Sequence, residues 1–197
     1  GETFCRLCPV PVTFLGFEVG DSVISGGDGV LSKGDALMKL LSIDCSASPA
    51  SAAVTEDGKV ISSAFVNIKV THSQTLMTLV EAVLDSAFLT LSDIDGFAVS
   101  AGPGSFTGVR IGASTVKGLA FAENKPCVGV SSLEAMARNV GRGIICPVMD
   151  ARRDQFYTAL FDGKTRLTEE AMQSLGYWTD GSYKGCYYET VYHMDAE

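Results

Sequence analysis

The fold of this chain is decided by one stretch, Gly96-Phe-Ala-Val-Ser-Ala-Gly-Pro-Gly-Ser-Phe-Thr-Gly-Val-Arg110. Its first part, Phe97 to Ala101, is short and apolar, which predicts a buried β-strand. Gly102-Pro-Gly104 then predicts a tight turn, because glycine accepts backbone angles that other residues avoid. Ser105 or Thr107 is a suitable N-cap for a helix that runs to about residue 123. A strand, a turn and a helix in direct succession are typical of an α/β fold.

The glycine-rich turn does not match the common phosphate-binding motifs. A P-loop requires a Lys after a Gly at fixed spacing, and the dinucleotide fingerprint requires a Gly where Thr107 stands. Two interpretations stay open: a weak nucleotide or anion site at the helix start, or a tight turn packed against a neighbouring strand or subunit. We favour the packed turn. The residues that would contact an anion under the first interpretation are Asp44, Ser46, Gly102, Gly104, Ser105 and Arg110.

Ser105 is not predicted to be a catalytic nucleophile. The elbow motif of hydrolases needs Gly at the two positions that Pro103 and Thr107 occupy. A triad also needs a His, but His72 precedes a predicted helix and His193 lies in the tail. We therefore interpret Ser105 as a helix cap and assign no catalytic residue.

Composition limits the classes of function. The 197 residues are 46% hydrophobic, which is enough for one two-lobed domain or two small domains. The formal net charge is −8, so nucleic acid is not expected to bind to this chain alone. No apolar run long enough to span a membrane and no signal peptide are found in the sequence. The six Cys are scattered, several within strand-like runs, which favours buried thiols in the cytoplasm.

From Met38 onward the pattern is regular. A buried strand over 39–44 ends in Asp44, and alternating strands over 50–54 and 60–68 flank a hairpin turn at 56–58. Helices are predicted at 74–88 and 133–139. A second strand, 144–150, again ends in an Asp and is followed by an alternating strand, 155–161. This recurrence predicts two related lobes, 38–142 and 143–197. Residues 168–175 suggest a short helix.

Residues 1–37 differ from the rest of the chain and are interpreted as an extension, a tag or a displaced segment. They hold the motif Cys5-Arg-Leu-Cys8, but no second Cys pair follows and the whole chain has two His. A metal or redox site is therefore not favoured, and we predict no metal site in the chain.

Two carboxylates and three arginines stay ambiguous. Asp44 and Asp150 end corresponding strands and would suit Mg²⁺ or water in a phosphoryl-transfer enzyme, although we favour a structural role. Arg110, Arg152 and Arg153 could bind carboxylates, phosphates or an acidic partner; ordinary ion pairs with Asp150 or Asp154 are the alternative.

Several blocks in unbroken order over residues 38–162 closely resemble the TsaB family of the bacterial tRNA threonylcarbamoyladenosine system. The blocks are Leu40-Leu-Ser-Ile-Asp-Cys-Ser46, Thr71-His-Ser-Gln-Thr-Leu76, Gly102-Pro-Gly-Ser-Phe-Thr-Gly-Val-Arg-Ile-Gly112, Gly129-Val-Ser-Ser-Leu-Glu-Ala135 and Met149-Asp-Ala-Arg-Arg-Asp-Gln-Phe-Tyr157. The resemblance implies the actin/Hsp70/sugar-kinase fold, with two RNase H-like lobes. It also implies a non-catalytic scaffold that pairs with the paralogous subunit TsaD, which transfers threonylcarbamoyl to A37 of tRNA.

The chain departs from this pattern after the last block. Family members carry a longer second lobe, and residues 12–16 and 26–30 faintly resemble a strand and a Gly-Asp-Gly turn found late in that lobe. A shortened or rearranged second lobe is therefore expected, and a permuted one would bring residues 10–30 near 154–161.

The resemblance also implies partners. These are a TsaD-like catalytic subunit, a TsaE-like ATPase, and a second copy of this chain when it is alone, with tRNA bound only through the complex. ATP and Mg are expected to be used by the complex, with no cofactor held by this chain. An ATP-dependent kinase or transferase of the same fold is the alternative function, and a peptidase is less favoured. Because first-lobe helices form the family's dimer surface, the predicted interface residues are Leu76, Val80, Val83, Leu84, Gly108, Gly112 and Thr115.

Overall fold

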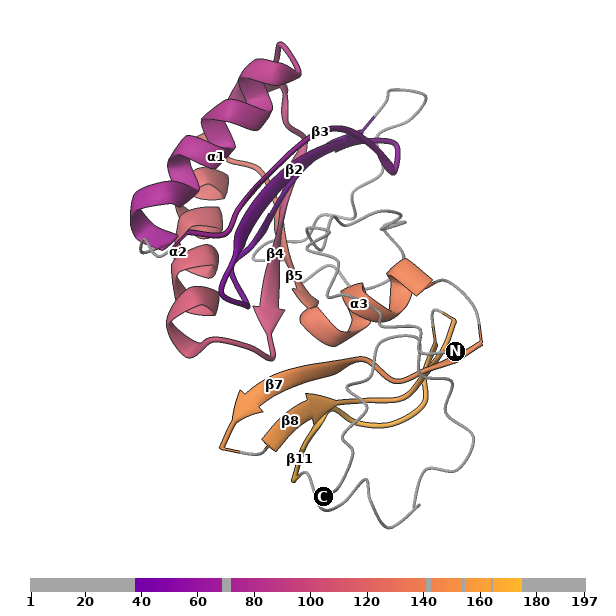
Figure 1. The fold of residues 1–197 in the computed structure, drawn as a ribbon. Helices are drawn as coiled ribbons and strands as arrows, with labels where there is room; N and C mark the ends of the chain where they lie inside the picture. The colour runs from indigo at the N-terminus through magenta and orange to yellow at the C-terminus, as the bar shows by residue number, and fades with distance from the viewer. Residues whose placement is uncertain (1–37, 69–71, 141–142, 154, 164, 175–197) are drawn as a thin grey trace, which may run out of the picture. The chain divides into compact units, whose positions relative to one another are not determined.

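The computed structural model describes residues 38–68, 72–140, 143–153, 155–163 and 165–174 (Figure 1). These residues form two compact units, with the boundary between Ser132 and Leu133. We call them the first unit (38–132) and the second unit (133–174). This spatial grouping does not test the lobe boundaries expected from the sequence, which stay a prediction. Among the described residues, no helix combines the length and the apolar character needed to cross a membrane.

The first unit is built on a mixed five-stranded sheet. Its strands are β1 (Lys39–Asp44), β2 (Ala50–Glu56), β3 (Lys59–Val66), β4 (Gly96–Gly102) and β5 (Cys127–Ser131), in the order β3-β2-β1-β4-β5. The first three strands are antiparallel neighbours, whereas β4 runs parallel to β1 and β5 parallel to β4. This arrangement is the one expected of an RNase H-like lobe, so the predicted α/β fold class is confirmed.

The predicted hairpin between the second and third strands is present. Asp57 and Gly58 form its turn with positive φ angles of 47° and 75°, which match the twist of two antiparallel strands. Asp and Gly tolerate this conformation better than most residues, so the Glu-Asp-Gly sequence was a dependable signal.

Two long helices cover one face of this sheet. Figure 1 shows α1 (His72–Ser86) and α2 (Phe106–Glu123) side by side against it. A 3-10 turn, η1 (Leu91–Asp93), leads from α1 toward β4. The helix predicted at 74–88 is confirmed, and its apolar stripe packs with side chains of the sheet and of α2 in one core. The largest fully buried members of this core are Leu41, Ile43, Val54, Leu76, Val80, Val83, Ile94, Phe97 and Val116.

Two large apolar residues of the predicted helix 74–88 lie outside the core. Met77 is 41% exposed, and Phe88, which follows the end of α1 with a φ of 56°, is 96% exposed. The helix ends at Ser86, two residues earlier than predicted. Phe88 is therefore not a helical residue, and the spacing that places Leu84 in the core does not apply to it.

The second unit contains one helix and a broken antiparallel meander. Helix α3 is Ser132–Val140, and the strands are β6 (Ile144–Ile145), β7 (Val148–Arg152), β8 (Gln155–Thr158), β9 (Phe161–Asp162), β10 (Thr165–Arg166) and β11 (Ala171–Ser174). They form two short sheets, β10-β9-β6 and β11-β8-β7. Leu133 and Ala137 of α3 pack with Ile145, Ala159 and Phe161 of the meander.

Pro147 lies where the predicted strand 144–150 is divided. Proline has no N–H for the ladder, and Thr158 instead donates its hydroxyl to the Pro147 carbonyl at 2.9 Å. The helix predicted at 168–175 is wrong: Ala171–Ser174 is a strand paired with β8. Pairing with a neighbouring strand has overridden a weak local helical pattern.

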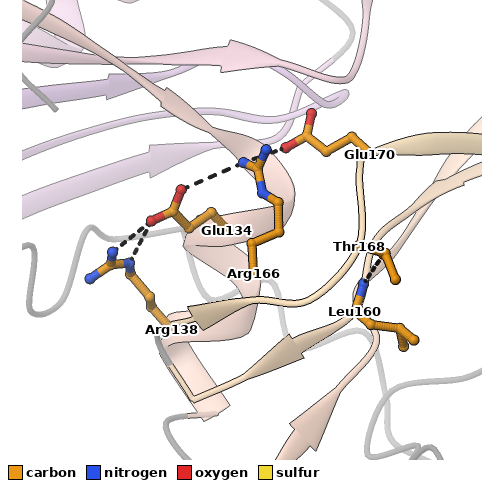
Figure 2. A network of polar contacts seen from close by, with 6 residues as sticks. All are labelled: Glu134, Arg138, Leu160, Arg166, Thr168 and Glu170. Carbon is orange, nitrogen blue, oxygen red and sulfur yellow. Dashed lines mark hydrogen bonds and ion pairs between the residues drawn. The ribbon is translucent and has the colours of Figure 1, made fainter.

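A network of charges ties α3 to the segment between β10 and β11 (Figure 2). The guanidinium of Arg138 bonds Glu134 one turn earlier at 2.6 Å, and the Arg166 guanidinium lies 3.7 Å from Glu134 and 3.0 Å from Glu170. Thr168 accepts the Leu160 N–H at 2.9 Å in the same region. Because the groups are partly exposed, the network orients these segments more than it stabilises them.

Candidate functional site

The candidate site lies where β1 and β4 end on the same edge of the sheet. Ile43 of β1 pairs with Val99 of β4 in parallel, so the segments that follow both strands meet. Asp44, only 8% exposed, accepts the Ser46 N–H on one carboxylate oxygen at 2.8 Å. This bond folds the chain sharply at the end of β1 and brings the Ser46 backbone toward the glycine turn after β4.

Ser46 and Gly104 are in direct contact, which we call the Ser46–Gly104 joint. A Cβ built on Gly104 would overlap the carbonyl oxygen of Ser46 and come within 2.9 Å of the Ser46 Cβ. The Ser105 N–H donates to the same carbonyl oxygen at 2.6 Å. Glycine at 104 is thus required by the close approach of another backbone. The joint matches the favoured interpretation of the turn as a packed structure.

Ser105 caps α2, as one of the two predicted candidates. Its hydroxyl accepts the Gly108 N–H at 3.3 Å. Both the backbone N–H and the hydroxyl oxygen of Ser105 are therefore engaged within the chain. This geometry uses the polar groups of Ser105 to hold the turn and the helix start together.

Cys45 fills the space beneath this joint. It is 1% exposed, and a Cβ built on Gly112 would lie 3.7 Å from its Cβ and 3.3 Å from a methyl carbon of Val99. Burial, together with the neighbouring Asp44 carboxylate, raises the pKa of the Cys45 thiol to about 12. The thiol is therefore neutral near pH 7 and serves as a packing group.

A buried pair of hydroxyls was missed in the sequence. The Ser100 and Ser132 hydroxyl oxygens are 2.6 Å apart, and both residues are 2% exposed. Their bond joins β4 to the first residue of α3. The only sequence signal was a Ser within the apolar run 97–101 and another after the run 127–130, and neither signal identified the other residue as its partner.

Arg110 lies on the exposed side of α2 and stacks on Phe106. Its guanidinium carbon is 3.6 Å from the centre of the Phe106 ring, one turn earlier. The predicted anion contacts of Asp44, Ser46, Gly102, Gly104 and Ser105 come together at the joint, whereas the Arg110 guanidinium is held by this stacking. Whether any of these six residues contacts an anion stays a prediction.

The predicted partner residues of α1 are core residues. Leu76, Val80 and Val83 are 1% exposed and Leu84 is 6% exposed, all within the first unit. Gly108 and Gly112 are also buried, and Thr115 is half-buried. The four α1 side chains pack on the sheet of their own unit, and whether a partner also contacts this helix stays a prediction. An interface on these helices would use the opposite, exposed side, and its existence stays a prediction.

The prediction that the second strand ends in Asp150 is wrong, because β7 of the second unit continues through Asp150 to Arg152. Asp150 is exposed and accepts the Arg152 backbone N–H at 2.6 Å. His72 begins α1. In the described ranges, no group of three or more His, Cys, Asp and Glu is placed to hold a metal ion. The Cys5-x-x-Cys8 motif and the comparison of residues 10–30 with 154–161 fall outside the described residues.

Comparisons with known proteins all find proteins of the tRNA threonylcarbamoyladenosine system or structures similar to them. A family model described as TsaD, tRNA N6-adenosine threonylcarbamoyltransferase, matches residues 60–187. The tRNA threonylcarbamoyladenosine biosynthesis protein TsaB of Bacillus subtilis is 38% identical over 68% of this chain and 60% of its own length, and that of Escherichia coli 36% over 62% and 54%. The structure of YeaZ from Pseudomonas aeruginosa is similar with a TM-score of 0.62 at 34% identity, over 68% of this chain and 67% of that one. The chain thus spans little more than half the length of these two curated relatives.

Proposed function

This chain belongs to the TsaB family, and from that premise we propose that it is a non-catalytic subunit which pairs with a TsaD-type protein in threonylcarbamoyl transfer to tRNA. The proposal treats the chain as a scaffold that supports and orients its partner. ATP and Mg are then used by the complex, a TsaE-type ATPase is the third component, and tRNA reaches this chain through the complex in the cytoplasm.

The observation that carries the scaffold role is the Ser46–Gly104 joint. In an enzyme that grips phosphates, glycine-rich turns leave room and backbone donors for the ligand. Here the room above Gly104 holds the Ser46 carbonyl, and the Ser105 N–H donates to that carbonyl at 2.6 Å. The turn is therefore occupied by the chain's own backbone, which supports a structural use of the motif.

The exposed side of α1 and α2 is the surface we propose for pairing. On α1 it presents Glu81 and Asp85, and on α2 it presents Lys117 together with Phe121, which is 89% exposed. Acids on one helix and a base on its neighbour suit a two-fold arrangement in which α1 of one chain faces α2 of a similar chain. A paralogous partner or a second copy of this chain would both satisfy this pattern.

Co-purification with the cognate TsaD-type protein tests the function. We expect a stable complex and tRNA modification that depends on adding this chain. ATP hydrolysis by the isolated chain that disappears in Asp44→Asn would instead establish the kinase or transferase alternative.

Met77→Glu tests the surface, with Ile61→Glu as its matched control. Met77 on α1 is 41% exposed and Ile61 on the edge strand β3 is 42% exposed, so both substitutions place a charge at equally accessible sites. We expect Met77→Glu to weaken complex formation at least tenfold, while Ile61→Glu pairs normally and both keep the wild-type melting temperature. Normal pairing by Met77→Glu would remove this side of α1 from the interface.

A further inference from the structure

The β7–β8 hairpin carries two adjacent arginines in the left-handed backbone conformation. Arg152 and Arg153 have φ angles of 66° and 56°. The Asp150 carboxylate accepts the Arg152 N–H at 2.6 Å and so holds the start of the turn. Left-handed backbone is unfavourable for residues with a large side chain and is usually occupied by Gly, Asn or Asp.

Other left-handed positions of the described chain mostly follow that rule. Asp57 and Gly58 form the first hairpin, Asn124 ends α2, and Gly143 and Gly163 occupy turns. Phe88 is a further exception. At the β7–β8 hairpin, Asn or Gly would serve the backbone better than Arg, so the turn alone does not explain the two arginines. Strain of this kind is tolerated where the side chain has a use.

Both arginine side chains are exposed, and within the described ranges neither makes an ion pair. The remaining described arginines are engaged: Arg110 stacks on Phe106, Arg138 binds Glu134, and Arg166 binds Glu170. Of the two ion-pair alternatives, the one with Asp150 is not observed, and that carboxylate accepts a backbone N–H of Arg152. The one with Asp154 falls outside the described residues. Two exposed arginines thus stand at adjacent positions of this hairpin.

We propose that Arg152 and Arg153 contact phosphate groups of the tRNA that the complex modifies. The proposal rests on the function proposed above. Guanidinium groups bind phosphate oxygens with two parallel hydrogen bonds, and phosphate contacts set the position of a nucleic acid without reading its sequence. Because the whole chain has a net charge of −8, an attraction for RNA requires a local cluster of cations such as this one. The hairpin positions RNA that the complex holds.

Replacing both arginines by Asn removes the guanidinium groups and keeps the turn, because Asn tolerates left-handed backbone. We expect Arg152→Asn/Arg153→Asn to melt at or above the wild-type temperature. The assay is equilibrium binding of an unmodified tRNA transcript to the chain in complex with its TsaD-type partner, from about 50 to 200 mM salt. Each phosphate contact contributes about −0.9 to the slope of log K against log salt concentration. With two contacts, the ratio of the wild-type to the double-variant association constant for tRNA should fall about tenfold over this range.

Lys59→Gln is the control, because Lys59 is an exposed cation at the other hairpin and makes no ion pair within the described ranges. Its salt slope should match that of the wild type. An unchanged slope in the double variant, or an equal change in the control, overturns the proposal. The proposal is also overturned if the double variant binds the TsaD-type partner more weakly but keeps the wild-type salt slope for tRNA binding. The hairpin would then contact the protein partner. If no complex forms, the proposed function fails and the arginine contact, which rests on it, fails with it. An unchanged slope in a complex that does form overturns the arginine contact alone.

Discussion

Replacing Gly104 by Ala tests whether close packing holds the Ser46–Gly104 joint. The new Cβ would overlap the Ser46 carbonyl oxygen and lie 2.9 Å from the Ser46 Cβ. Ser46 is 2% exposed and its carbonyl is part of the backbone, so neither atom can turn aside and the two segments must separate. Overpacking of this kind costs about 1–3 kcal/mol, and losing the bond from the Ser105 N–H adds about 1 kcal/mol. The expected loss of stability is about 2–4 kcal/mol.

The same substitution at Gly118 provides the control. Gly118 lies within α2, and a Cβ there meets no atom within 4 Å. Since Ala is favoured over Gly in a helix by about 1 kcal/mol, Gly118→Ala should stabilise the protein. For a chain of this size, about 1 kcal/mol shifts the melting temperature by about 2–4 °C. Thermal unfolding followed by circular dichroism should show a fall of about 5–15 °C for Gly104→Ala and a rise of a few degrees for Gly118→Ala.

A wild-type melting temperature for Gly104→Ala would refute the reasoning, because it would mean that the two segments separate at no cost. Loss of partner binding in a Gly104→Ala protein of undiminished stability would also contradict it. That result would assign the turn to the interface itself.

Three further predictions concern the same unit. Ser105→Ala removes the cap of α2 and should cost about 1 kcal/mol in urea unfolding, and an unchanged midpoint would show that the Gly108 N–H does not depend on this hydroxyl. Val80→Glu places a charge in the core and should prevent folding. The control Ala82→Glu, on the exposed side of α1, should keep the wild-type circular dichroism spectrum. A folded Val80→Glu protein would contradict the burial of Val80. The Cys45 thiol should resist iodoacetamide near pH 8 in the native protein and react after unfolding, as peptide mapping would show. Because its pKa rises from 9.0 to about 12 on folding, this group's contribution to stability is present below about pH 9 and is lost as the pH rises toward 12, and Cys45→Ala should remove that loss.

Much of the first unit could be predicted because its signals are local. The Asp57–Gly58 turn, the strand that ends in Asp44 and the cap at Ser105 each depend on a few neighbouring residues. The second unit was harder to predict. Residues 171–174 form a strand because β8 lies beside them, and no local pattern records that neighbour.

The candidate site could be predicted only in part, because its contacts are long-range. The glycines of the turn indicated that something comes close, and the structure identifies it as the Ser46 carbonyl, far earlier in the chain. Likewise, an apolar stripe on a helix indicates burial without naming what buries it. Val80 and Val83 were assigned to a partner, whereas their contacts are with the sheet of their own unit.

The burial of that stripe changes how pairing must be tested. A substitution at Val80 would abolish pairing by unfolding the first unit, so a lost complex would carry no information about the interface. The exposed side of α1 and α2 avoids this ambiguity, because Met77 and Phe121 already face solvent and contribute little to the core. Any partner that covers them gains apolar burial that the isolated chain lacks, roughly in proportion to the area removed from water. Variants on this side that keep the melting temperature and lose the complex therefore measure the contact with the partner itself.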